Sequence, residues 1–218
     1  MYRELINRIL TSLLLMPILI YSLYYSGFYF IIFLSIVYLI CFYEIIKNTK
    51  NLFFIISSNI VLIFSLFSFY YLRGFSNYSL IIMYWILVST FLSDIGGYVF
   101  GKVFKGKKLT KISPNKTYSG SIGSTIFSIG SIPLLDMLQN IFFNENLINF
   151  YQLKYLLLTI LISIICQLGD LYVSFWKRKI NIKNISNILP GHGGVLDRID
   201  GLIFVLIFCF LIKKIGLI

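Results

Sequence analysis

Seven long apolar runs, separated by short polar segments, constrain the fold of this chain more than any other feature of its sequence. A bilayer core is about 30 Å thick, and a helix needs about 20 mostly apolar residues to cross it. Lipid offers no water to the backbone, so helices, which satisfy their own polar groups, are the expected spanning element. The runs therefore predict an all-α, polytopic integral membrane bundle with about seven transmembrane helices, near residues 10–25, 28–46, 52–72, 80–100, 120–138, 153–173 and 201–212.

The composition agrees with a membrane protein. Hydrophobic residues make up 58% of the 218 positions and charged residues 12%, whereas about a quarter of a soluble domain is charged. No linker or internal repeat divides the chain, so we expect one membrane-embedded domain, residues 1–218. The first run follows basic residues, as in a signal peptide, but no small-residue cleavage site follows it, so we expect a retained helix. The cysteines lie in apolar runs without a CxxC pair, which argues against a disulfide framework or a cysteine metal site: Cys41, Cys166 and Cys209.

The net charge of +11 is concentrated in two polar segments, residues 101–119 and 174–200. An even number of predicted spans precedes each segment, so both lie on the side of the N-terminus, and their Lys and Arg content predicts that this side is cytoplasmic. In a soluble protein such a charge would suggest nucleic acid. Beside membrane spans it indicates anionic headgroups or nucleotides as partners, and no nucleic acid. Arg73, Lys213 and Lys214 are exceptions to the charge bias.

Acidic residues within apolar runs are costly and are functional hypotheses by default. Glu44 and Asp136 lie near the ends of their runs, where a carboxylate can reach water, so we expect no special function for them. Asp94 and Asp170 lie beside the two basic segments and are candidates for a site.

The first candidate region begins at Asp94. Gly97, Tyr98 and Gly101 follow on the same face of a helix, and the glycines would let either a neighbouring helix or a ligand approach closely. The next loop offers hydroxyls and cations, and the segment 120–124 places small residues at a helix N-terminus, where backbone amides can bind phosphate. A solvated, positively charged loop is the alternative interpretation.

The second candidate region is more specific. Asp170, Ser174, Lys177 and Arg178 form one stripe if the helix of the sixth run continues beyond the membrane surface. Downstream, His192 and its two following glycines predict a tight turn, although a lone histidine can also serve in capping or packing. Two further acids are three residues apart on one face of a helix that starts near them, and carboxylate oxygens suit Mg²⁺: Asp197 and Asp200.

These motifs resemble the signature of the phosphatidate cytidylyltransferase family. The resemblance is carried by Ser174–Arg178, Lys183 and Pro190–Asp200, with little slack in the spacing. Residues 8–17, 94–101, 112–117 and 169–171 are similar to upstream motifs of that family. The catalytic motifs therefore fall in residues 94–124 and 167–201.

Four positions depart from the family pattern. The family has an acid at the position of Asn184, usually has one at the position of Ser119 and often has one at the position of Val173. Trp176 replaces a smaller apolar residue. These departures leave the metal affinity, the turnover and the full ligand set open.

The resemblance implies attack of the phosphate of phosphatidic acid on the α-phosphate of CTP, giving CDP-diacylglycerol and pyrophosphate. It implies Mg²⁺ as cofactor, with room for a second cation, held first by Asp170 and Asp197 and then by Asp200 and Asp94. It further implies a multi-pass protein of the bacterial inner membrane with cytoplasmic catalytic loops, and relatives suggest a homodimer.

The remaining roles are also implied by the resemblance. Lys177, Arg178 and Arg198 would bind phosphates, and Ser174 and His192 would orient a phosphate or the metal shell. Four residues would contact the nucleotide or headgroup: Ser113, Lys116, Thr117 and Lys183.

Three other interpretations stay open. A related membrane enzyme, such as a CTP-dependent polyprenol kinase or an archaeal-type lipid cytidylyltransferase, would use the same chemistry on another acceptor. A transporter or channel would place Asp94 and Asp170 along an ion path, and would predict repeated or broken helices. An inactive relative would explain Asn184 and Ser119.

Overall fold

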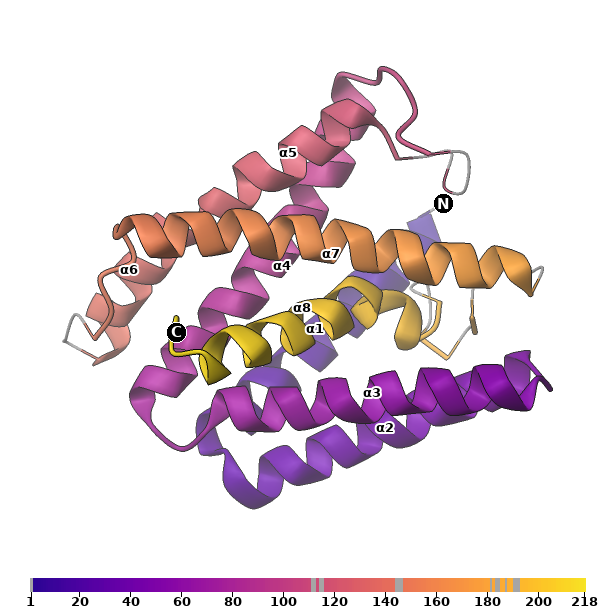
Figure 1. The fold of residues 1–218 in the computed structure, drawn as a ribbon, viewed down its shortest axis with the longest axis horizontal. Coiled ribbons are helices and arrows are strands. Elements are labelled where there is room, and N and C mark those ends of the chain that lie inside the picture. The colour runs from indigo at the N-terminus through magenta and orange to yellow at the C-terminus, as the bar shows by residue number, and fades with distance from the viewer. Residues whose placement is uncertain are drawn as a thin grey trace.

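The computed structural model describes residues 2–110, 113, 116–143, 147–180, 182, 185, 186, 188, 189 and 193–218. Before Leu13, Thr11 is the one residue whose side chain is described. Within these residues the chain forms eight α-helices (Figure 1). They are α1 (Tyr2–Tyr25), α2 (Gly27–Asn48), α3 (Leu52–Arg73), α4 (Asn77–Val103), α5 (Tyr118–Ile129), α6 (Ser131–Phe143), α7 (Leu153–Lys179) and α8 (Leu196–Lys214). The extended pairings among the described residues are two isolated antiparallel bridges, Lys108 with Thr117 and Leu189 with Gly193.

The helices confirm the prediction of an all-α membrane bundle. Five helical segments of the described chain are long and apolar enough to cross a bilayer: α2, α3, α4, the α5–α6 segment and α7. The apolar part of α1, Leu13–Tyr25, is shorter. The fifth predicted span is two helices, α5 and α6, that meet at Gly130.

The helix α4 forms the centre of the bundle and is the most buried of the candidate spans. Its polar side chains pair with those of other helices: Trp85 Nε1 donates to Thr159 Oγ1 at 3.0 Å, and Ser93 Oγ lies 2.8 Å from Ser163 Oγ. Buried polar groups in a membrane protein require such partners, because lipid supplies none. The pairs fix how α4 and α7 face each other.

The glycines after Asp94 form a packing seam between α4 and α5. A Cβ atom added at Gly97 would lie 2.5 Å from Ser124 Oγ, and one added at Gly120 would lie 2.9 Å from the Gly97 carbonyl oxygen. Of the two interpretations of these glycines, close approach of a neighbouring helix is therefore the one that the structure supports. In Figure 1, α5 runs alongside α4.

Both basic segments lie at one end of the bundle. Figure 1 shows the end of α7, the start of α8, the loop before α5 and the α2–α3 connection gathered at the end that also holds the N-terminus. Contacts agree with this arrangement: Lys116 Nζ is 3.2 Å from Asp170 Oδ2, and Asn48 Nδ2 donates to the carbonyl of Ile185 at 2.6 Å. Segments far apart in the sequence thus share one polar surface.

At the other end, basic residues that were exceptions to the charge bias act as helix caps. The buried Arg73 side chain donates to the carbonyls of Leu23 at 2.5 Å and Tyr24 at 3.2 Å, at the end of α1. Lys213 Nζ donates to the carbonyl of Leu72, at the end of α3, at 3.3 Å. The last carbonyls of a helix lack intrahelical partners and carry partial negative charge, so cations are favoured there. Helix capping explains why these cations lie away from the other basic residues.

Candidate active site

The predicted acids and lysines come together where α7 meets the start of α8. The helix α7 continues to Lys179 and α8 begins at Leu196, so both helices extend through the motifs as the sequence pattern required. Asp170 and Lys177 then lie on α7, and Asp197 lies in the first turn of α8.

Glycines allow α7 and α8 to approach closely beside the acids. A Cβ atom at Gly169 would lie 3.2 Å from the Cα of Gly201, and a Cβ at Gly201 would lie 2.8 Å from Asp170 Oδ1. Any larger residue at position 201 would displace the Asp170 carboxylate. Across this contact between the helices, the side chains of Asp170 and Asp200 interact electrostatically.

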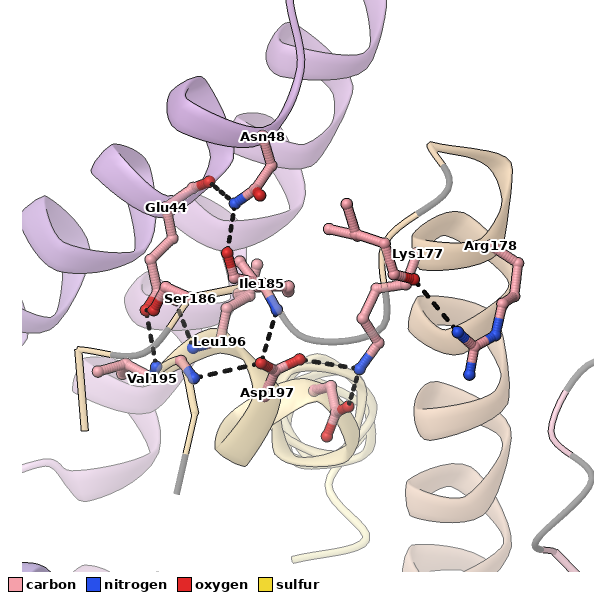
Figure 2. Close-up of polar contacts among 12 residues, drawn as sticks. Glu44, Asn48, Lys177, Arg178, Ile185, Ser186, Val195, Leu196 and Asp197 are labelled. Atoms are coloured by element: carbon pink, nitrogen blue, oxygen red, sulfur yellow. Dashed lines mark hydrogen bonds and ion pairs between the residues drawn. The ribbon is translucent and has the colours of Figure 1, made fainter. Parts of the chain in front are cut away.

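Lys177 lies between two carboxylates of α8. Its Nζ is 2.9 Å from Asp197 Oδ1 and 3.6 Å from Asp200 Oδ2, and the three side chains are only 13%, 10% and 14% exposed, respectively (Figure 2). Charge-assisted hydrogen bonds of this kind are stronger than neutral ones, above all where water is scarce. The ammonium group is therefore held at a fixed place beside the two acids.

Asp197 also organises the polar segment that precedes α8. Its Oδ2 accepts the backbone amides of Ile185 at 2.8 Å and Gly194 at 3.2 Å, and its Oδ1 faces Lys177 (Figure 2). An acid in the first turn of a helix is also favoured by the helix dipole. Both carboxylate oxygens of Asp197 thus have protein partners.

Glu44 on α2 is a site residue that the sequence interpretation missed. The expectation that its carboxylate reaches water is wrong, since the residue is 0% exposed. Its carboxylate accepts hydrogen bonds from Ser186 Oγ at 2.5 Å and from the amides of Val195 and Leu196 at 2.9 Å each. A Cβ at Gly194 would lie 2.8 Å from Glu44 Oε1. Glu44 therefore holds the start of α8 and needs the glycine beside it.

The amide of Asn48, one turn after Glu44, adds a second link from α2 to the same segment. Its Nδ2 donates to the carbonyls of Glu44 and Ile185, each at 2.6 Å (Figure 2). The only sequence signal for this anchor was an acid near the end of an apolar run. Asp136 gave the same signal, yet it is half-buried and accepts a hydrogen bond from its own helix, from Gln139 Nε2 at 3.1 Å.

The first candidate region contributes a lysine and an acid, Lys116 and Asp94, that interact with Asp170. Lys116 forms an ion pair with Asp170 at 3.2 Å. Asp94 on α4 accepts a hydrogen bond from Cys166 Sγ at 3.5 Å and interacts electrostatically with Asp170 and Arg198. The region between α4, α7 and α8 therefore combines carboxylates with cations from distant parts of the chain.

Other predicted residues lie apart from this cluster. Arg178 is exposed, and its Nη1 donates to the carbonyl of Ile182 at 3.3 Å (Figure 2). Thr117 caps α5, since its Oγ1 accepts the amide of Gly120 at 3.1 Å.

Ser113 and Ser174 are both half-buried. The carbonyl of Ser113 accepts a hydrogen bond from the amide of Lys116 at 3.0 Å. Ser174 lies one turn beyond Asp170 on α7. His192 and Lys183 lie outside the described residues.

The carboxylates fit a divalent cation in part. Among the described residues, no three His, Cys, Asp or Glu side chains converge as ligands on one point, so the four predicted ligands do not form a single ready-made shell. Asp170 and Asp200 lie side by side, and two like charges so close are stabilised by a cation between or beside them. Oxygen ligands of this kind suit Mg²⁺, which also retains waters and binds substrate phosphates.

The chain is similar in sequence to a family of known proteins. The sequence profile of the Cytidylyltransferase family matches residues 49–215. A protein named phosphatidate cytidylyltransferase from Rickettsia conorii is 40% identical over 121 residues, which are 55% of this chain and 52% of that protein. Proteins of the same name from Staphylococcus haemolyticus and Helicobacter pylori are 45% and 37% identical over 57% and 60% of this chain, and 45% and 46% of their own lengths.

The aligned part of the chain spans about half the length of these curated relatives. The family profile, by contrast, covers most of the chain and includes every described acid and lysine of the cluster, from Asp94 to Asp200. The chain therefore belongs to the cytidylyltransferase family.

Proposed function

We propose that this chain transfers the cytidylyl group of CTP to phosphatidic acid, forming CDP-diacylglycerol and pyrophosphate. The observation that carries the proposal is Lys177, held between Asp197 and Asp200 at the polar end of a membrane bundle, within the stretch that matches the cytidylyltransferase family. Relatives that carry the name phosphatidate cytidylyltransferase support this choice of acceptor.

Phosphoryl chemistry between two anionic reactants needs positive charge placed in advance. The protein provides Lys177 beside Asp197 and Asp200, and Lys116 beside Asp170. When substrates bind, each lysine can exchange part of its carboxylate contact for a phosphate oxygen while it stays in position. Fixed cations of this kind stabilise the charge that develops on the transferred group without reorganisation of the site.

Asp170 and Asp200 are the residues that would hold Mg²⁺, with Asp94 next to them. When bound, the ion would neutralise phosphate charge and help to fix the geometry of the reacting groups. Asp197, a metal ligand by the family resemblance, has a different role in this proposal. Because its oxygens bind Lys177 and two backbone amides, it orients the lysine and the polar segment.

The reaction needs no general base from the protein. The second pKa of a phosphate monoester is about 6, so the attacking phosphate oxygen is already ionised near neutral pH. This oxygen forms a bond to the α-phosphorus of CTP, the bond from that phosphorus to the bridging oxygen breaks, and pyrophosphate leaves with the electron pair. The described residues then only bind, orient and neutralise.

We place the site at the cytoplasmic surface of the bacterial inner membrane. The basic segments share one end of the bundle, as the positive-inside tendency favours for a cytoplasmic face. CTP would reach this end from water, while the tails of the lipid acceptor stay in the bilayer.

The direct test is conversion of radiolabelled CTP by the purified protein in detergent, with phosphatidic acid and Mg²⁺ and with an EDTA control. We expect a lipid-soluble CDP product that disappears when EDTA is added. If product forms with a polyprenol or another lipid but not with phosphatidic acid, the proposed acceptor is wrong and the proposed transfer from CTP still holds. No product with any acceptor would overturn the proposal and favour an inactive relative or a transporter.

A further inference from the structure

A mostly apolar groove runs from the candidate site into the membrane region between α3 and α7. It encloses a cavity of about 110 Å³, and α8 and the end of α2 complete its walls. In Figure 1, α8 lies between α7 and α3. Tyr172, which lines the cavity, is 49% exposed, so the groove reaches the surface of the molecule. Because α3 and α7 are both candidate membrane spans, this surface faces lipid.

The lining of the groove changes from polar to apolar along its length. Lys177, Asn48 and the buried Glu44 lie at the end next to the candidate site, and Ser57 and Ser58 line the adjoining part of α3. Val61, Leu62 and Phe204 line the interior. On α3 the lining runs from Phe54 to Leu62, a separation of eight residue steps, which is about 12 Å at a rise of about 1.5 Å per residue. This length lies within one leaflet of the bilayer, about 15 Å of hydrocarbon.

Lys177 belongs to both the groove and the charged cluster. Its side chain lines the cavity, and its Nζ is 2.9 Å from Asp197. A molecule with an anionic headgroup at Lys177 and an apolar tail toward Leu62 would match the charge and the hydrophobicity of the groove together. A nucleotide would not match it, because its polar atoms would be left without partners along the apolar part.

We propose that this groove binds one acyl chain of the anionic lipid acceptor and so places the phosphate of that lipid beside Lys177. The inference rests on the proposed function and adds the position of its lipid substrate. The rings of Phe54 and Trp176, whose centroids are 4.9 Å apart, join α3 to α7 across the polar end of the groove. They separate the acyl chain from the aqueous loops.

Photo-crosslinking tests the occupant in the wild-type protein without any need for turnover. The probe is a phosphatidic acid with a photoreactive group at the end of one acyl chain, in detergent micelles and in vesicles. We expect labelled peptides from α3 and α8 around Val61, Leu62 and Ile203, and competition by unlabelled phosphatidic acid. Labelling spread evenly over the exposed lipid-facing residues, without competition, would overturn the inference.

A matched pair of variants on α3 tests the effect on the reaction. Val61 lines the groove, whereas the adjacent Ile60 is 62% exposed and lies outside the lining. We expect Val61→Phe to raise the KM for dioleoyl phosphatidic acid by roughly tenfold or more, to change the KM for dihexanoyl phosphatidic acid little, and to leave the KM for CTP unchanged. The control, Ile60→Phe, should behave like the wild type.

The failures of the two proposals are distinguishable. If the wild type converts neither the long-chain nor the short-chain acceptor, the proposed function fails. If the wild type converts both, and Val61→Phe shows the same dependence on chain length as Ile60→Phe, the groove does not bind the acyl chain. If Val61→Phe is not recovered in folded form, Ser58→Leu, which fills the same cavity from the same helix, takes its place with the same expected result.

Discussion

Glu44 Oε2 on α2 accepts a hydrogen bond from the backbone amide of Leu196 at 2.9 Å, between residues 152 positions apart in the chain. The first amides of a helix lack intrahelical partners, and a carboxylate is favoured beside them. Glu44 supplies that carboxylate to α8 from outside the stretch that matches the family profile, residues 49–215. The turn of α8 that carries Asp197 and Asp200 therefore depends on a helix that holds none of the family motifs.

Replacement of Glu44 by Ala should destabilise the protein and reduce its activity. Two backbone amides and the Ser186 hydroxyl lose their acceptor, and each buried group left unsatisfied costs about 1–3 kcal/mol. We expect a lower Tm in detergent and a larger loss of kcat than of CTP affinity, with partial rescue by Glu44→Gln, which keeps one acceptor oxygen. Asp136→Asn is the control, because Asp136 lies on α6 and bonds only within that helix in the described contacts. A Glu44→Ala protein with wild-type Tm and turnover would contradict the assigned role.

Asp197→Asn should abolish turnover while the protein still inserts and folds. The amide oxygen of Asn can still accept from the Ile185 and Gly194 amides, but the negative charge that holds Lys177 is lost. Turnover with CTP and phosphatidic acid, together with the elution profile of the purified variant, measures both consequences. Near-normal turnover in a folded variant would remove Asp197 from the site.

Lys177→Ala should either destroy turnover or raise the requirement for CTP or lipid. The substitution removes the cation that Asp197 and Asp200, both largely shielded from solvent, share, and loss of one charge-stabilising group in an active site costs about 10²–10³ in kcat. Lys102→Ala serves as the control, because Lys102 is exposed and contacts Tyr98 on its own helix. If kcat and the KM values of the Lys177 variant equal those of the wild type, Lys177 has no role in the reaction and contributes only to the positive charge on this side of the membrane.

Gly201→Ala should alter metal dependence as well as stability. Its Cβ would lie 2.6 Å from Cys166 Sγ and 2.8 Å from Asp170 Oδ1, so the helices must separate or the carboxylate must move. Gly123→Ala is the matched comparison, because it disturbs the close approach of α4 and α5 at Phe100, where no carboxylate is in contact. Both variants should show a lower Tm, and only Gly201→Ala should raise the Mg²⁺ concentration for half-maximal activity. An equal Mg²⁺ dependence in both variants would exclude Asp170 from the metal site.

Much of the fold and part of the site could be predicted from the sequence, because the signals are local. The length of each apolar run predicts a helix, and the spacing of Asp170 and Lys177 predicts that α7 continues beyond the membrane surface. The structure confirms the helices and shows that α7 is continuous from Asp170 through Lys177 to Lys179. It also confirms a helix beginning at Leu196, which places Asp197 and Asp200 near its start.

Some features were left open, since local patterns do not specify them. The fifth apolar run is one candidate span, as predicted, but the break of its helix into α5 and α6 at Gly130 was not predicted. Arg73 and Lys213 look like misplaced positive charges until the carbonyls of Leu23 and Leu72 are seen beside them. The glycines after Asp94 could allow close approach of either a ligand or a helix. Only the position of α5, which packs against them, decides between these two interpretations.

The sequence by itself therefore determined that this protein is a helical membrane enzyme candidate with its reactive motifs in two basic segments, because hydrophobic length, charge bias and helical spacing act over short stretches of chain. Tertiary structure alone decided which groups meet. The pairing of Lys116 with Asp170 joins residues 54 positions apart, and that of Glu44 with the start of α8 joins residues 152 apart. Such contacts follow from how the helices pack around α4 and from the glycines that let α7 and α8 approach, and no local pattern encodes them.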